Sequence, residues 1–343
     1  MKKILAIFYS LTLIFVLPKT VFANQYTEVI EGRVVGSPVD NYLLVEIKSG
    51  QEKKTVPVFI EDGLFAEQIK LKVGSKVMIS PISETEDTYY LADIVRRQSL
   101  IPLLILFLAL VLLVGGWRGV GSLFGLIASL LVVALLVVPL IADGNNPVLV
   151  VLLGSFIIVP LTFYFSHGFS KKTTIAIVGT VIALAFSGFL AQGAIQATQL
   201  TGLVSEEAGF LQSANPGAYN LTGILLAGII IGLLGVLDDV TVSQAAIVSE
   251  LLAVDKDISD KELFLRAMSI GKDHVSSMVN TLILVYTGVS LPLLLLFHSN
   301  PRPLLQVVNY EVFTEEIVRA LIGSIGLILA IPLTTILAIK WSR

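Results

Sequence analysis

Residues 221–244 read LTGILLAGIIIGLLGVLDDVTVSQ, an apolar run that leads directly into two adjacent aspartates, Asp238 and Asp239. The apolar part is long enough for a membrane-spanning helix, which needs about 20 mainly apolar residues. A carboxylate at bilayer depth costs about 3 kcal/mol on insertion scales, so such a group usually faces water, a partner or an ion path. The stretch therefore predicts a membrane helix followed by an acidic segment whose carboxylates face water, a partner or an ion path.

The composition of the whole chain also indicates a membrane protein. Of its 343 residues, 55% are hydrophobic and 14% charged, and the mean hydropathy is +0.87. Soluble domains carry about 25% charged residues. The net charge of −3 gives no basic surface for a nucleic acid, so we predict no nucleic-acid partner. With no cysteine and only three widely spaced histidines, the sequence predicts neither a metal site nor a cofactor.

The first 98 residues divide into two segments. Residues 1–23 begin with two lysines, continue as a short apolar run and end in small residues, which predicts a signal peptide. An uncleaved membrane anchor is the alternative. Residues 24–98 hold about five short β-prone runs separated by Gly, Pro, Asn and Asp. They predict a small all-β domain, an OB-like barrel or a sandwich.

The remainder, residues 99–343, predicts an all-α membrane bundle of about seven helices. The predicted spans are 100–117, 119–140, 147–166, 173–192, 219–237, 276–297 and 316–339. If the β-domain is exported, most lysines and arginines of the connections fall on the cytoplasmic side, as the positive-inside rule requires. The predicted topology therefore has the β-domain outside and the C-terminus in the cytoplasm.

Residues 238–274 are predicted to form a cytoplasmic amphipathic loop. On a helix over 236–252, the side chains of Asp239, Ser243 and Glu250 fall within about 40° of one another, with Asp238 beside them and Gln244 on the apolar half. One interpretation is an interfacial helix whose carboxylates face water. The other is a helix that enters the bundle and lines a polar cavity. The sequence leaves both open.

The start of the sixth predicted span supplies polar partners for this segment. Asn280 either packs or hydrogen-bonds across helices. His274 is either a solvated loop histidine or a proton-sensing partner of Asp239. No P-loop, HExxH, GxSxG or GxGD motif is present, and adjacent aspartates on a helix point about 100° apart. We therefore predict no catalytic residues and no enzyme.

Several motifs together carry a resemblance to a known family. They are Gly232–Val240 (GLLGVLDDV), Ser269–His274 (SIGKDH), Met278–Leu284 (MVNTLIL), Gly188–Gly202 with Glu206 and Glu207, and Gly323–Gly326 leading into Ile331–Thr334. With these motifs, the chain from about residue 28 onward resembles the YibE/F-like family of bacterial multi-pass membrane proteins. The resemblance implies a location in the bacterial cell membrane and, between the two aspartates, favours Asp239. It implies no substrate.

Three hypotheses of function follow. The first is a permease-like transporter with Asp239 as the ion- or proton-coupling group, supported by Asp238, Ser243, Gln244, Glu250, Asn280 and His274. The second is an assembly or regulatory protein of the lipid bilayer, which binds a membrane-protein partner or a second copy through the β-domain and the helix at 260–270. The third, the weakest, is an intramembrane enzyme that uses Asp239 with His274.

Overall fold

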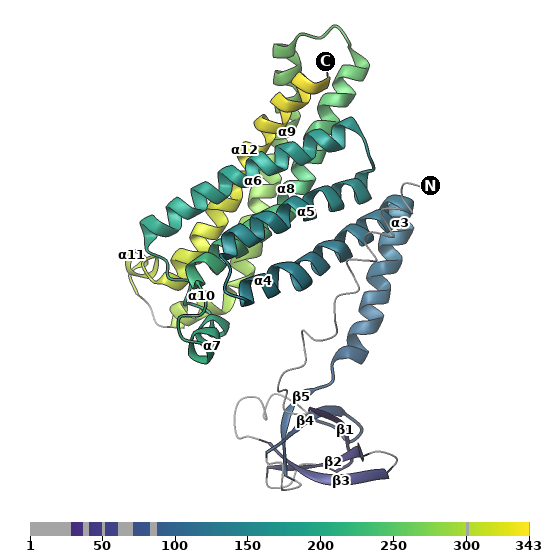
Figure 1. Cartoon of the computed structure of the whole chain (residues 1–343), viewed down its shortest axis with the longest axis vertical. Coiled ribbons are helices and arrows are strands. Elements are labelled where there is room, and N and C mark those ends of the chain that lie inside the picture. The colour runs from purple at the N-terminus through teal and green to yellow at the C-terminus, as the bar shows by residue number, and fades with distance from the viewer. Residues whose placement is uncertain are drawn as a thin grey trace. The chain divides into compact units, whose positions relative to one another are not determined.

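The computed structural model describes residues 29–36, 41–49, 52–60, 71–82, 88–299 and 302–342. The signal peptide predicted over residues 1–23 lies outside them. The chain divides into two compact units, one up to Leu108 and one from Ala109 onward (Figure 1).

The first unit contains a closed β-barrel. Its strands are β1 (Ile30–Val34), β2 (Tyr42–Ser49), β3 (Glu52–Phe59), β4 (Lys76–Pro81) and β5 (Tyr89–Ile94). The order around the barrel is β1-β2-β3-β5-β4, and β1 pairs with β4 to close it. All neighbours are antiparallel except β3 and β5. The small all-β domain predicted from the sequence is confirmed, and it is a closed barrel and not a sandwich.

The barrel core follows from the alternation of side chains along each strand. Leu43, Val45 and Ile47 point inward from β2, and β3 and β4 contribute pairs with the same spacing of two. Gly32 of β1 stands opposite β2 and β4, and a Cβ there would lie 2.2 Å from a Val45 methyl carbon. The barrel can therefore close at this point only around a residue without a side chain.

The helices follow in chain order. They are α3 (Arg97–Val132), the π-helical segment η1 (Val133–Val137), α4 (Val138–Ala142), α5 (Pro147–His167), α6 (Lys171–Thr198), α7 (Glu206–Ala214), α8 (Leu221–Val254), α9 (Asp260–Val289), α10 (Leu291–Ser299), α11 (Leu304–Val307) and α12 (Glu311–Ser342).

The helical path breaks inside α3 and bends between α9 and α10. Within α3, Gly116 has a positive φ of 52°, and the helical path divides there between the first two predicted spans. This conformation favours glycine because it places a Cβ against the backbone. The sixth predicted span is bent by 60° between α9 and α10. Pro292 lacks the N–H that would continue the helical hydrogen bonds across this junction.

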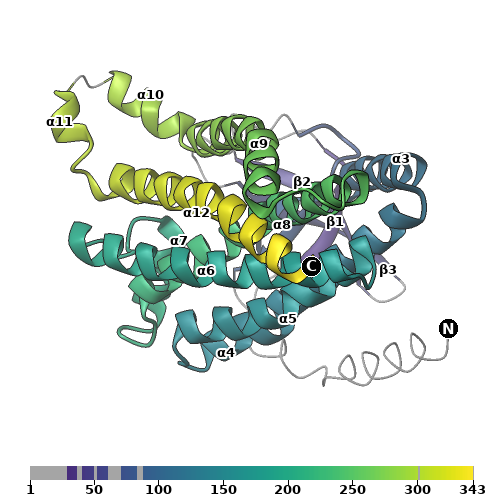
Figure 2. The same cartoon turned by 90° about the horizontal axis from the view of Figure 1, so that it is seen from above.

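Three helices form the centre of the second unit. α6, α8 and α12 pack against one another in pairs, α5 packs on α8, and α9 packs on α12 and α8. Figure 2 shows α12 running between α6 and α9. The largest buried cluster takes most of its residues from α6, α8 and α12.

The contact between α6 and α12 is a seam of small residues. A Cβ on Gly179 of α6 would lie 2.5 Å from the Thr334 hydroxyl, and a Cβ on Gly326 of α12 would lie 2.4 Å from the Ser187 hydroxyl. Ala183 and Ala330, both buried, lie midway between these points on their helices. Small residues at intervals of four let two helices approach closely in a membrane, where apolar burial alone does not drive them together.

Five helices in the described residues are long and apolar enough to cross a membrane, or six if α9 and α10 form one span. The Arg97–Ala142 segment, which contains the Gly116 break, counts once in that number. A membrane-type helical unit that follows a small β-domain is thus present.

Candidate functional site

The acidic segment lies within a single long helix. α8 runs from Leu221 to Val254, past both aspartates. Asn220 caps its start by accepting a hydrogen bond from the Gly223 amide at 2.9 Å. The range 238–274 therefore consists of the end of α8, a short connection and the first half of α9. Aspartate is only a moderately poor helix former, so two of them do not end a helix that is packed on both sides.

The two aspartates face different surroundings. Asp238 is partly buried, with 28% of its side chain exposed. Its Oδ1 is buried and has no hydrogen-bond partner among the described residues. Asp239, one position further, is exposed. Burying a carboxylate oxygen without a partner costs free energy, so Asp238 is less favourably placed than the exposed Asp239.

A histidine lies beside Asp238. His167 Nε2 is 4.0 Å from Asp238 Oδ1, too far for a hydrogen bond but within the limit for an ion pair with a protonated imidazole. Asp239, Arg118 and Lys172 are also close enough to act on His167 electrostatically. Residues from α3, α5, α6 and α8 thus bring charges of both signs to one end of the bundle.

The connection between α5 and α6 fixes the position of His167. Gly168, with a φ of 75°, ends α5 directly after this residue. The Tyr164 ring stacks on Phe169 with 4.3 Å between ring centroids, and its hydroxyl lies 3.1 Å from that of Thr174. The Ser170 side chain then caps α6 by accepting from the Thr173 amide. The turn is therefore held from both helices.

Beyond Asp238, the bundle contains a buried set of hydrogen-bonded side chains, Thr180, Thr241, Gln244 and Thr335, which we call the polar layer. The Thr180 and Thr241 hydroxyl oxygens are 2.7 Å apart. Because the Thr241 hydroxyl donates to the Leu237 carbonyl, Thr180 donates to Thr241. The polar layer joins α6 to α8 at this point.

Gln244 connects α8 to two more helices. Its Nε2 donates to the Ala267 carbonyl of α9 at 3.1 Å and to Thr335 Oγ1 of α12 at 2.7 Å. Its Oε1 lies against Gly271, where a Cβ would come within 2.9 Å. Gly271 therefore allows α9 to pass close to the amide, and the polar layer joins four helices.

In the described part of the helical unit, three further hydroxyls are buried and have no hydrogen-bond partner. They belong to Thr334, Ser187 and Ser324. Thr334 lies next to Thr335 of the polar layer, and 0% of it is exposed. Most buried polar groups in proteins are paired, so these three hydroxyls are exceptions to the usual pattern.

The structure separates the residues that the sequence groups together. Gln244 is buried in the polar layer, Asp238 and Ser243 are partly buried, and Asp239, Glu250, His274 and Asn280 are exposed. In the described part of the chain, no hydrogen bond or ion pair joins Asp239 to His274 or Asn280. The same residues contain no cluster of three or more His, Asp or Glu side chains that could hold a metal ion.

His167 and the threonines of the polar layer were not among the site residues predicted from the sequence. The threonines had a visible signal, because Thr180 and Thr335 each lie inside a predicted span, where polar residues usually have partners. No signal in the sequence marked His167, because it stands at the boundary of its predicted span and because Asp238, its neighbour in space, is distant in sequence.

Comparisons with known proteins give one match. The YibE/F-like protein family matches residues 103–343, so the helical part carries the match and the β-barrel lies outside it. No curated protein and no solved structure matches the chain. The resemblance seen in the sequence motifs is confirmed, and the chain belongs to the YibE/F-like family.

Proposed function

We propose that this protein is a permease-like transporter of the bacterial cell membrane whose ion path passes Asp238 and the polar layer. In this proposal, the break at Gly116 divides the Arg97–Ala142 segment into two spans, and the bent pair of α9 and α10 makes one, which gives seven spans. The β-barrel is outside, and the C-terminus is in the cytoplasm.

One observation carries the proposal: a partly buried carboxylate stands one turn before a buried polar layer on the same membrane helix. The Thr241 hydroxyl is within 3.4 Å of the Asp238 carbonyl, so the two features adjoin. Ionisable and polar residues inside a membrane bundle commonly mark ion paths and proton relays. The unpaired Asp238 Oδ1 and Thr334 hydroxyl offer oxygens for a passing proton, water molecule or monovalent cation.

Of the two aspartates, Asp238 is the better candidate for the coupling group. It faces His167, and its oxygen is withdrawn from solvent. Asp239, which the sequence and the resemblance favour, lies on the exposed face with Glu250. We assign Asp239 a supporting role, as part of the charge around His167.

Flux through reconstituted vesicles tests the proposal. Purified protein is placed in vesicles that contain a pH-sensitive dye, and a potassium gradient with valinomycin drives proton uptake. We expect Asp238→Asn to reduce the flux at least tenfold and Asp239→Asn to leave most of it, because the carboxylate that faces the bundle is lost only in the first. Wild-type vesicles that take up protons no faster than protein-free vesicles would refute proton transport.

A second function is favoured by a different surface. Ser276, Asn280 and Thr287 lie at helical spacing on one exposed face of α9. Polar side chains on the outside of a membrane helix commonly hydrogen-bond to another helix. This face supports an assembly role, in which α9 binds a second copy of the chain or another membrane protein.

A further inference from the structure

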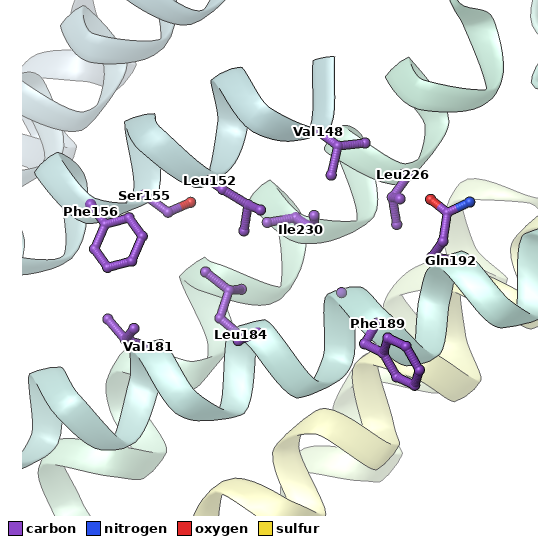
Figure 3. A pocket seen from close by; sticks show the side chains of 12 residues that line it. Val148, Leu152, Ser155, Phe156, Val181, Leu184, Phe189, Gln192, Leu226 and Ile230 are labelled. Atoms are coloured by element: carbon purple, nitrogen blue, oxygen red, sulfur yellow. The ribbon is translucent and has the colours of Figure 1, made fainter. Parts of the chain in front are cut away.

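A groove on the side of the helical unit is separate from the site described above. It has a volume of about 340 Å³ and lies between α5 and α6, with α8 below them. Figure 3 shows Leu152 and Leu184 projecting toward each other across it, with Ile230 of α8 behind them. α5 and α6 both pack on α8 but have few contacts with each other, which leaves the space between them open.

The wall of the groove is apolar and faces away from the bundle. Of the side chains that line it, only Ser155 and Gln192 carry polar atoms. The Ser155 hydroxyl is already used, because it donates to the Val151 carbonyl at 2.8 Å. Phe156 is 59% exposed and Phe189 81% exposed. The groove therefore opens at an exposed apolar surface, and on a membrane-type helical unit such a surface faces lipid.

The ends of the groove differ in polarity. At one end, Val148, Leu226 and Gln192 lie together, and at the other lie Phe156 and Val181 (Figure 3). Val148 is the second residue of α5, and Leu226 and Gln192 are within two turns of the end of their helices. The polar end is therefore near the boundary of the membrane, and the groove extends from there toward the interior.

The length of the groove matches one leaflet. Val148 and Phe156 are eight residues apart on α5, which is about 12 Å at the helical rise. Half of a hydrocarbon core of about 30 Å is about 15 Å. A molecule that fits this groove has a polar group at the boundary and a hydrocarbon chain that extends to the middle of the bilayer.

We propose that this groove binds one acyl chain of a membrane phospholipid, with the Gln192 amide hydrogen-bonded to its ester or headgroup. The Gln192 amide can donate to an ester carbonyl or a phosphate oxygen. The apolar walls formed by α5, α6 and α8 replace neighbouring lipid chains around the bound one. The proposal rests on the groove alone and does not depend on transport through the polar layer.

A matched pair of glycine variants on α6 tests the site. A Cβ on Gly188, which lines the groove, would meet only Ile230 side-chain carbons at 3.6 Å and beyond, so Gly188→Leu fills the groove without a backbone clash. Gly193 is exposed with nothing within 4 Å of its Cβ position, so Gly193→Leu makes the same chemical change outside the groove. Ala185→Phe is a second filling variant.

The full-length protein is placed in phosphatidylethanolamine and phosphatidylglycerol vesicles containing a phospholipid with a diazirine on one acyl chain. After irradiation, peptides are mapped by mass spectrometry. We expect adducts to concentrate on residues 148–156 and 181–192, to fall several-fold in Gly188→Leu and Ala185→Phe, and to persist in Gly193→Leu. Equal labelling in the filling variants, or labelling no stronger than at exposed Ile328 of α12, would overturn the proposal.

Native mass spectrometry of the detergent-purified protein identifies the ligand. We expect a co-purified phospholipid in the wild type and in Gly193→Leu, its loss in Gly188→Leu, and several-fold weaker retention in Gln192→Leu. A free fatty acid in place of the phospholipid, or equal retention in Gly188→Leu, would contradict the assignment.

Discussion

At the scale of single residues, Gln244 has the most connections in the polar layer. One amide group, 2% exposed, joins α8 to α9 and α12. Interhelical hydrogen bonds in membranes contribute about 0.6–2 kcal/mol each. We therefore expect Gln244→Leu, which keeps the volume and removes both bonds, to lower the free energy of unfolding by about 1–3 kcal/mol. Thermal unfolding of the purified protein in detergent measures this change.

The neighbouring position supplies the control for this prediction. Ser243 is only half-buried, so Ser243→Ala should change stability by less than about 0.5 kcal/mol. If Gln244→Leu is as stable as Ser243→Ala, the polar layer does not hold the helices together, and its role in the proposed ion path becomes the main reason for its presence.

At the scale of elements, the exposed face of α9 leads to a prediction about association. If Asn280 faces a second copy, Asn280→Cys should form a disulfide-linked dimer in oxidised membranes, since the native chain has no cysteine. Ile328→Cys, on an exposed position of α12, is the control and should remain monomeric on a non-reducing gel. Equal cross-linking at both positions would indicate random collision, and no cross-linking at Asn280 would argue against a dimer through this face.

The elements also show what the sequence could predict. A helix at 260–270 was expected, and in the structure Ser259 caps it by accepting from the Glu262 amide, as local sequence requires. Gln244 was correctly placed on the apolar half of its helix, which is the half that the bundle buries. Which of two adjacent aspartates turns inward could not be predicted, because α5 and its His167, distant in sequence, decide it. The predicted fifth span ends at residue 237, before the two carboxylates. In the structure α8 continues to Val254, because packing against other helices keeps this stretch helical.

At the scale of the whole molecule, the two units have separate cores. Among the described residues, the buried apolar core of the barrel comes from strands β1 to β4, and none of it comes from a helix. A closed barrel also leaves no open sheet edge, so it needs no cover from the helical unit. We therefore expect residues 28–99 to fold alone, with a β-type circular dichroism spectrum and one cooperative thermal transition.

The stability of this barrel should depend on acid pH through Asp93. The Arg96 guanidinium, 2.7 Å from Asp93 Oδ2, lowers the pKa of that carboxyl in the folded state; burial opposes this effect, and the Ile94 amide adds to it. The stabilisation is complete above the unfolded pKa of about 3.9 and is lost as the pH falls through the lower folded value. Asp93→Asn should therefore lower the melting temperature at pH 7, and the difference in melting temperature from wild type should narrow below about pH 4.

Glu46→Gln is the control: it removes only the exposed ion pair with Lys53 and should show a smaller difference in melting temperature at pH 7. A gap for Asp93→Asn that is as wide at pH 3 as at pH 7 would mean that the carboxylate's charge does not stabilise the barrel. An unfolded fragment at pH 7 would show instead that the barrel depends on the rest of the chain.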